Sequence, residues 1–177
     1  MCIRDSDYGT HGPSTTITTA CAAGNDAVGH AFRSIRYGEL DAVLTGGAEC
    51  ILTSVAIGGF ERAGAASTRS SATPRPFDAD RDGLVIGEGA GMMVLESLEH
   101  ARARGATILA EIAGYGQTTD AYHITAPPDS GSGAARAIRR ALADAGLRPA
   151  DVDYVSAHGT ATPVSYTHLT PPTSDLV

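Results

Sequence analysis

Residues 15–24 read Thr-Thr-Ile-Thr-Thr-Ala-Cys-Ala-Ala-Gly, and this stretch constrains the fold more than any other part of the chain. The run at 15–19 predicts a β-strand, because side chains branched at Cβ favour extended backbone. A helix is predicted over 20–37, where apolar side chains recur at helical spacing. These side chains are Val28, Ala31, Phe32 and Ile35, and Gly38 is suited to end the helix. Cys21 is therefore expected where a strand turns into the start of a helix.

This position gives Cys21 a candidate chemical role. The unpaired backbone N–H groups and the dipole at a helix start favour an anion, and the thiolate is the nucleophilic form of cysteine. A buried structural cysteine is the alternative, since free cysteine behaves as a small hydrophobe. The position alone leaves both interpretations open.

The residues after this helix predict a βαβ unit. Residues 41–45 indicate a short strand whose lack of alternation suits a parallel strand covered on both faces. With the strand at 15–19, the connection is expected to be right-handed. Gly46 and Gly47 either let the backbone pass close to the Cys21 helix or simply form a tight turn.

Further elements follow from periodicity and from capping residues. Helices are predicted at 54–61, 97–104 and 131–145, with Ser97 as an N-cap and Gly105 just past the helix end. Strands are predicted at 108–114 and 154–157, and another after 87–91. The glycines at 87–91 do not match the spacing of a dinucleotide loop and precede a strand, which argues against nucleotide binding.

His158 is the second candidate for chemistry, because it ends the predicted strand at 154–157. In open α/β sheets, ligands bind at this end of the strands. Thr160 and Thr162 would place hydroxyls at the same rim. The alternatives are a hydrogen-bonded structural histidine and threonines that cap a local turn. His11 lies in a Gly/Pro loop and is interpreted as a solvated side chain.

The bulk composition excludes several classes of protein. A net charge of −7 argues against a nucleic-acid partner, which would select a basic surface. Three cysteines in 177 residues do not make a disulfide framework and favour a reducing compartment, the cytoplasm. No apolar run approaches the roughly 18 residues that indicate a membrane helix, and no metal site is expected.

Four motifs in order resemble the β-ketoacyl-acyl-carrier-protein synthases, the condensing enzymes of the thiolase-like fold. They are Thr19-Ala20-Cys21; Ala-Val-Leu-Thr-Gly-Gly-Ala-Glu at 42–49; Arg75-Pro76-Phe77-Asp78 with Arg81-Asp82-Gly83 and the glycines at 87–91; and Ala-His-Gly-Thr-Ala-Thr-Pro at 157–163. The loop Asp-Ala-Tyr-His-Ile-Thr-Ala-Pro-Pro at 120–128 is similar to that of the elongating type II enzymes of fatty-acid synthesis.

This resemblance implies an α/β, thiolase-like, layered α-β-α-β-α fold, of which only a central part is present. Residues 8–163 would be a partial synthase domain, made of the end of the N-terminal half and the start of the C-terminal half. The implied reaction is a decarboxylative Claisen condensation, in which an acyl group on Cys21 is extended by two carbons. His158 would be the second catalytic residue, and Thr160, Thr162 and Thr125 would bind substrate.

The resemblance also implies partners. The acyl carrier protein would bring the acyl and malonyl groups on its own phosphopantetheine, so no resident cofactor is expected. A homodimer is implied, with the strand at 15–19 near its two-fold axis. Residues 75–82 would form a structured loop with a buried ion-pair network; a solvated loop is the alternative interpretation.

Residues 1–7 and 164–177 fall outside the family pattern, and His168 in the second stretch replaces no family residue. We therefore expect an internal fragment with foreign sequence at both ends, lacking the second histidine and the lysine of the family. Such a piece would expose apolar faces, aggregate and show little or no turnover.

Three other functions remain as alternatives. A polyketide ketosynthase is the nearest rival, although residues 120–128 favour the fatty-acid enzymes. A catalytically silent structural subunit is disfavoured by the presence of Cys21. A cysteine hydrolase with a Cys21–His158 dyad lacks an identifiable orienting Asn or Asp.

Overall fold

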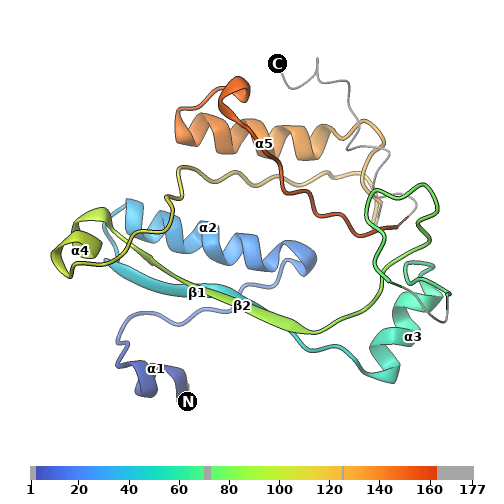
Figure 1. Ribbon diagram of the computed structural model, residues 1–177, viewed down its shortest axis with the longest axis horizontal. Helices are drawn as coiled ribbons and strands as arrows, with labels where there is room; N and C mark the ends of the chain where they lie inside the picture. The colour runs from blue at the N-terminus through green and yellow to red at the C-terminus, as the bar shows by residue number, and fades with distance from the viewer. Residues whose placement is uncertain (1–2, 70–72, 125, 163–177) are drawn as a thin grey trace. The chain divides into compact units, whose positions relative to one another are not determined.

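The computed structural model describes residues 3–69, 73–124 and 126–162. Its helices and strands are drawn in Figure 1. The chain divides into two compact units. The first unit comprises Met1–Gly47 and Ala90–Ile112, and the second comprises Ala48–Gly89 and Ala113–Val177.

The first unit is built around one helix and a two-stranded sheet. In chain order its elements are α1 (Ile3–Tyr8), η1 (Ala20–Ala22), α2 (Ala23–Arg36), β1 (Ala42–Glu49), β2 (Gly89–Glu96) and α4 (Leu98–Ala103). β1 and β2 pair with each other, and their arrows point in opposite directions in Figure 1. The N–H of Ser97, just after β2, donates to the Asp41 carbonyl just before β1, at 2.9 Å. The sheet is therefore antiparallel.

The predicted helix over 20–37 is confirmed as η1 followed by α2. Its apolar face points inward, with Ala31 6% exposed and Val28, Phe32 and Ile35 partly covered. The helix ends at Arg36 with Tyr37 as its C-cap, and Gly38 follows with φ 73°, a left-handed conformation that glycine adopts without steric cost. α4 is also confirmed: the Ser97 hydroxyl accepts from the His100 N–H at 3.2 Å as an N-cap.

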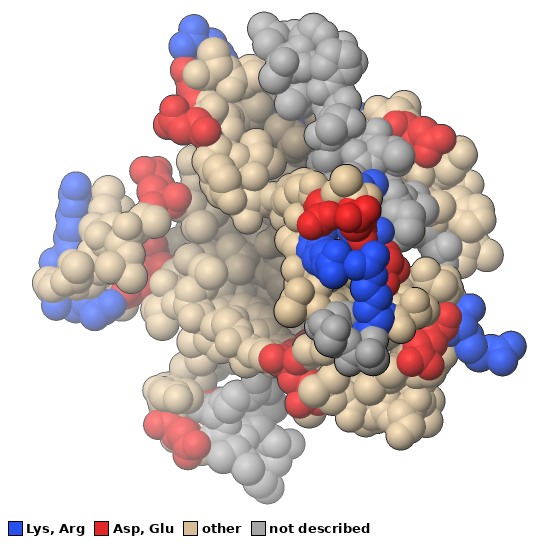
Figure 2. All heavy atoms as spheres, turned by 45° about the vertical axis from the view of Figure 1, so that its right-hand side comes forward, with Lys and Arg blue, Asp and Glu red and all other residues tan. Residues whose placement is uncertain are grey.

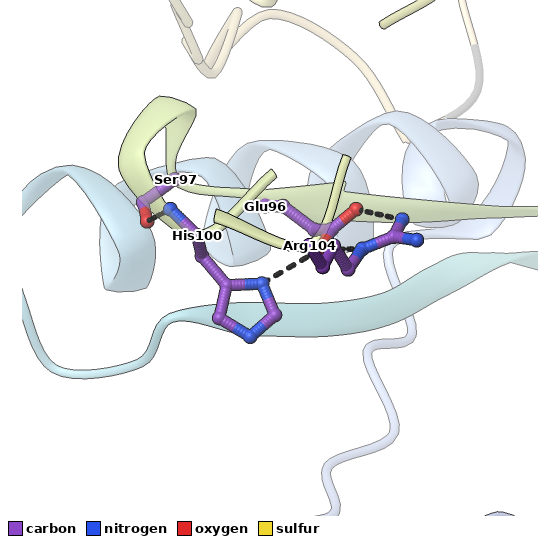
Figure 3. A network of polar contacts seen from close by, with 4 residues as sticks. All are labelled: Glu96, Ser97, His100 and Arg104. Atoms are coloured by element: carbon purple, nitrogen blue, oxygen red, sulfur yellow. Dashed lines mark hydrogen bonds and ion pairs between the residues drawn. The ribbon is translucent and has the colours of Figure 1, made fainter. Parts of the chain in front are cut away.

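α4 is tied to the end of β2 by a polar network (Figure 3). The Arg104 guanidinium donates two hydrogen bonds to the Glu96 carboxylate, and His100 Nδ1 lies 2.7 Å from Glu96 Oε1. The bonds from Arg104 lower the pKa of Glu96 from 4.5 to about 2, and His100 acts in the same direction, while partial loss of hydration opposes both. Glu96, His100 and Arg104 thus connect the end of β2 to α4 through charged hydrogen bonds, and these three residues are called the Glu96 clamp.

The second unit contains helices joined by irregular chain. Its elements are α3 (Ser54–Arg62), α5 (Ser132–Ala145) and η2 (Pro149–Asp151), with a parallel bridge between Ala66 and Leu84. α3 and α5 confirm the predicted helices at 54–61 and 131–145. Gly131 and Gly146 bracket α5 in left-handed conformations. The Arg148 side chain holds η2 through two hydrogen bonds to Asp151, which lower the pKa of that carboxyl.

Three predicted strands are wrong. Residues 15–19, 108–114 and 154–157 run as irregular chain, so the βαβ unit expected around α2 does not form. A β-branched sequence favours extended backbone, but a strand also needs a neighbour that exchanges backbone hydrogen bonds. Across 3–69, 73–124 and 126–162, β1 and β2 are the strands that find such a neighbour. The prediction of β1 as a parallel strand covered on both faces is also wrong, since it is antiparallel and mostly exposed.

The described residues bury little apolar volume. Their buried hydrophobic side chains are Ala31, Ala66, Ala101 and Ala161. Large apolar side chains lie open to water, among them Leu109 at 93% and Ile124 at 97% exposure. Secondary structure here therefore depends on capping, glycine contacts and polar networks more than on a packed core.

Candidate active site

Cys21 lies in η1, the single 3₁₀ turn that leads into α2. The residue before it, Ala20, has φ 50°, which is a left-handed conformation that a side chain with a Cβ adopts at a cost. This turn is closed by the Ala22 N–H, which donates to the Thr19 carbonyl at 3.1 Å. The thiol is free and exposed. The chain thus presents an exposed cysteine at a strained helix start, and the alternative of a buried cysteine does not describe this structure.

The buried carboxylate of Asp26 accepts a hydrogen bond from the residue that precedes this turn. The Thr19 hydroxyl donates a hydrogen bond to Asp26 Oδ2, and Asp26 is 4% exposed in the first turn of α2. A negative charge there is stabilised by the positive end of the helix dipole. Thr19 and Asp26 therefore bracket Cys21 and fix the path of the backbone on both sides of it.

Glycines bring β1 close to the start of α2. A Cβ placed on Gly47 would lie 3.3 Å from the Gly24 Cα, so the two backbones nearly touch. The interpretation that these glycines let the backbone pass close to the Cys21 helix is thereby confirmed for Gly47. Gly46 instead approaches Gly91 and Met92 of β2, and both glycines lie inside β1 and not in a tight turn. The position of the Cys21 turn relative to β1 depends on this small-residue contact.

The other predicted site residues lie in the second unit. His158 is exposed, and Thr160 Oγ1 lies 3.1 Å from Thr162 Oγ1. Between the two threonines, Ala161 is 3% exposed and left-handed, with φ 62°. The bend at Ala161 brings the two hydroxyls together, so Thr160 and Thr162 form one polar pair.

Two residues from the 78–84 segment hold this bend. The Gly83 N–H donates to the Ala161 carbonyl at 3.1 Å, and Arg81 Nε donates to the Thr162 carbonyl at 3.3 Å. In the sequence, Arg81 and Gly83 belong to a family motif, but the motif does not predict their contact with residues 161 and 162. These contacts join positions about eighty residues apart, and no local spacing pattern indicates them.

Thr125 lies outside the described residues, but the loop that carries it is anchored on α5. The Asp120 carboxylate sits directly over Gly133 in the first turn of that helix, where a Cβ would collide with it. The Arg136 guanidinium donates to the Thr119 carbonyl at 3.3 Å. The start of the 120–128 loop is therefore fixed to the N-terminal turn of α5.

The prediction of a buried ion-pair network at residues 75–82 is wrong, because the ion pair found there is partly exposed to water. Arg69 Nε lies 3.5 Å from Asp82 Oδ2, and these side chains are 43% and 28% exposed. The Ser67 hydroxyl also donates to Asp82 at 2.8 Å. The loop is ordered by polar contacts that remain partly hydrated, because the residues around it do not exclude water.

Two family models match the chain. The beta-ketoacyl synthase N-terminal domain matches residues 5–101, and the beta-ketoacyl synthase C-terminal domain matches residues 109–166. The chain belongs to the beta-ketoacyl synthase family.

Curated relatives in the beta-ketoacyl synthase family are considerably longer than this chain. The 3-oxoacyl-[acyl-carrier-protein] synthase 2 of Staphylococcus aureus is 52% identical over 160 residues, which are 89% of this chain and 40% of the relative. The mitochondrial 3-oxoacyl-[acyl-carrier-protein] synthase of Arabidopsis thaliana is 49% identical over 161 residues, or 89% of this chain and 35% of the relative. The chain thus spans less than half the length of these relatives.

Solved structures of beta-ketoacyl synthases share this fold. A ketosynthase complex with its type II polyketide acyl-carrier protein matches with a TM-score of 0.90 and 44% identity, covering 93% of this chain and 41% of the other. A synthase from Burkholderia phymatum matches with a TM-score of 0.79 and 49% identity, covering 84% and 36%. The predicted thiolase-like α/β fold class is confirmed, and the chain covers only part of that fold.

Three further observations concern the surface, the helices and the metal-binding side chains of this member of the family. Acidic and basic side chains mix in small groups on the described part of the face drawn in Figure 2. Among the residues that the structure describes, none of the helices combines the length and apolarity needed to cross a membrane. Nor does this part of the chain gather three His, Cys, Asp or Glu side chains into a possible metal site.

Proposed function

We propose that this chain carries the acyl-accepting centre of a β-ketoacyl-acyl-carrier-protein synthase of fatty-acid biosynthesis. The observation that supports this most is the placement of Cys21: an exposed thiol at the start of α2, directly after the left-handed Ala20. The identity of 52% to a 3-oxoacyl-[acyl-carrier-protein] synthase 2 adds support.

In the first half-reaction, the Cys21 thiolate attacks the carbonyl carbon of an acyl thioester on the carrier protein. The new carbon–sulfur bond forms as the carrier's thiolate leaves and takes a proton. The product is an acyl-enzyme. Backbone N–H groups near Cys21 are suited to hold the oxyanion of the tetrahedral intermediate.

In the second half-reaction, a malonyl group on a second carrier protein loses CO₂. The electron pair of the broken bond forms an enolate, whose carbon attacks the acyl carbonyl on Cys21. Cys21 leaves as a thiolate, and the carrier keeps a 3-oxoacyl chain that is two carbons longer. In this scheme a ring N–H of His158 donates a hydrogen bond to the enolate oxygen.

The carrier protein brings its substrates on a phosphopantetheine arm, and Thr160, Thr162 and Thr125 are proposed to bind this arm. The paired hydroxyls of Thr160 and Thr162, 3.1 Å apart, suit the amide and hydroxyl groups of such a ligand. No resident cofactor takes part in this scheme. We further propose a cytoplasmic homodimer and residues 8–163 as the synthase domain.

A direct experiment follows acyl transfer to the chain. The purified protein is incubated with an acyl carrier protein loaded with a fatty acyl group, and the mass of each cysteine-containing peptide is measured. Acylation is expected on Cys21, to be lost in Cys21→Ala and retained in Cys50→Ala. Cys50 is the matched control, since it is also an exposed free thiol, but one that donates to the Glu88 carboxylate at 3.3 Å. Equal acylation of both cysteines, or none, would argue against the proposal.

A polyketide ketosynthase is the second candidate, because a type II polyketide ketosynthase shares the fold with a TM-score of 0.90. The two functions differ in whether the 3-oxo group is removed before the next condensation. The protein as its native locus encodes it is therefore supplied with an acyl carrier protein that carries a fatty acyl primer and with malonyl carrier protein, without any enzyme that reduces the 3-oxo group. A single two-carbon extension that then stops indicates fatty-acid synthesis, whereas repeated extension to a poly-oxo chain indicates the polyketide reaction.

A further inference from the structure

The backbone between Thr160 and Thr162 adopts a conformation that it would not choose alone. Ala161 is left-handed, with φ 62°, and a Cβ disfavours that region. Ala161 is also only 3% exposed, so the surrounding residues enclose this unfavourable backbone conformation. Such a conformation persists only where surrounding contacts determine it.

The contacts that determine it come from the segment at 78–84. Gly83 donates its N–H to the Ala161 carbonyl at 3.1 Å, and Arg81 Nε donates to the Thr162 carbonyl at 3.3 Å. Two successive carbonyls of the bend are therefore each held by one donor. A charged donor makes a stronger hydrogen bond than a neutral one, which favours arginine at this position.

The anchors themselves are fixed in place. Arg81 Nη1 also donates to the Asp78 carbonyl at 3.1 Å, so one guanidinium bridges two backbone segments. A Cβ on Gly83 would lie 2.6 Å from both Ala66 C and Ser67 N, and the neighbouring Leu84 N–H donates to the Ala65 carbonyl at 2.7 Å. Only glycine fits this close approach, which makes Gly83 a rigid support.

We propose that Arg81 and Gly83 are positioning residues that hold Thr160 and Thr162 in one hydroxyl pair for the pantetheine arm of the carrier. This inference rests on the proposed function, which assigns the two threonines to that arm. Without the bond from Arg81, Ala161 relaxes toward a right-handed conformation and the two hydroxyls separate. Binding of the pantetheine arm then weakens. The residues around Cys21 are unchanged, so the rate of the chemical step is expected to change little.

The test is kinetic and uses the protein as its native locus encodes it. Arg81→Ala is expected to raise KM for acyl carrier protein about 5- to 10-fold, the effect of losing one or two hydrogen bonds, with kcat within about two-fold. Arg81→Lys is expected to give a KM between those of the unmodified protein and Arg81→Ala. The lysine ammonium restores a charged donor but not the planar guanidinium that reaches both the Thr162 and the Asp78 carbonyls. The matched control is Arg139→Ala, an exposed arginine on α5, whose KM is expected to stay unchanged.

A double-mutant cycle separates positioning from general destabilisation. In a Thr160→Val, Thr162→Val background, Arg81→Ala is expected to raise KM by less than two-fold, since the hydroxyls that it positions are gone. The same increase in both backgrounds would overturn the inference, as would an unchanged KM in Arg81→Ala.

A structural readout keeps the inference independent of the proposed function. In the 177-residue chain, Arg81→Ala is expected to shift the methyl NMR signals of Thr160 and Thr162, whereas Arg139→Ala leaves them in place. Unmoved signals would overturn the role of Arg81. If the unmodified protein transfers no acyl group but the signals move, the proposed function fails and the positioning role of Arg81 stands.

Discussion

The Thr19 hydroxyl donates a hydrogen bond to the carboxylate of Asp26, and Cys21 lies in the turn between them. Asp26 is 4% exposed, so its charge depends on donors supplied by the protein. The bond links the residue that precedes the strained Ala20 to the first turn of α2. The orientation of the candidate nucleophile is therefore coupled to a buried carboxylate.

Removing this donor is expected to destabilise the first unit. Thr19→Val keeps the shape of the side chain but leaves a buried carboxylate with one donor fewer, which costs about 1–3 kcal/mol. Urea-induced unfolding followed by circular dichroism measures the loss. Thr18→Val is the control, because Thr18 is exposed and also β-branched. Equal effects of the two substitutions would show that the bond to Asp26 does not matter for stability.

Gly46 is expected to tolerate no side chain. A Cβ there would collide with the Gly91 carbonyl and would lie 2.8 Å from the Met92 Cα, so β1 and β2 would have to separate. Gly46→Ala should cost about 3 kcal/mol, at the upper end for overpacking. Gly58→Ala is the contrasting variant: Gly58 lies within α3 with open space around it, and alanine there should stabilise the helix by about 0.5–1 kcal/mol. Thermal unfolding of both variants gives the comparison.

The exposed apolar side chains predict self-association. Leu109 and Ile124 are 93% and 97% exposed, and burying such apolar surface between molecules is favourable. Sedimentation velocity of the 177-residue chain should show species that grow with concentration, and the dye ANS should bind to it. The double variant Leu109→Glu, Ile124→Glu is expected to shift the distribution toward monomer. A concentration-independent monomer in the unmodified chain would contradict this expectation.

Helices could be predicted from the sequence because the information that forms them is local. Ser97 and Gly105 mark the two ends of α4, and both occupy the capping positions that their chemistry favours. The apolar spacing of α2 likewise lies within fourteen consecutive residues. The hydrogen bonds of a helix join residues four apart, so the pattern that predicts it is local, although most of its stability comes from packing of its apolar face.

Strands and the site loop could not be predicted in the same way, because they depend on partners distant in the chain. Residues 15–19 have the composition of a strand, yet extended sequence does not supply the neighbour that a ladder requires. The anchor between Arg81 and Thr162 joins positions 81 apart. The position of Cys21 at a helix start could be predicted because a helix start is a local feature, whereas the contact of Arg81 with Thr162 and the strain at Ala161 become visible only when the folded backbone is known.

The hydrogen bonds that Arg104 and His100 make with Glu96 are expected to make the stability of the first unit depend on pH. The folded carboxyl has a pKa of about 2, against 4.5 for the ordinary group, because Arg104 and His100 stabilise its charge. A lowered pKa contributes stability that is fully present above pH 4.5 and is lost as the pH falls through about 2. The stability difference between the unmodified chain and Glu96→Gln should therefore be largest near neutral pH and should shrink between pH 4.5 and 2.

Urea unfolding at several pH values, each at low salt and in about 1 M NaCl, measures this difference. Salt is expected to reduce it, since the Arg104 and His100 side chains are 55% and 44% exposed and their interactions with Glu96 are screened. Glu99→Gln serves as the control, because Glu99 is an exposed carboxylate in α4 outside the hydrogen bonds that hold Glu96. A pH-independent difference for Glu96→Gln would mean that the clamp acts through packing of the side chain and not through its charge.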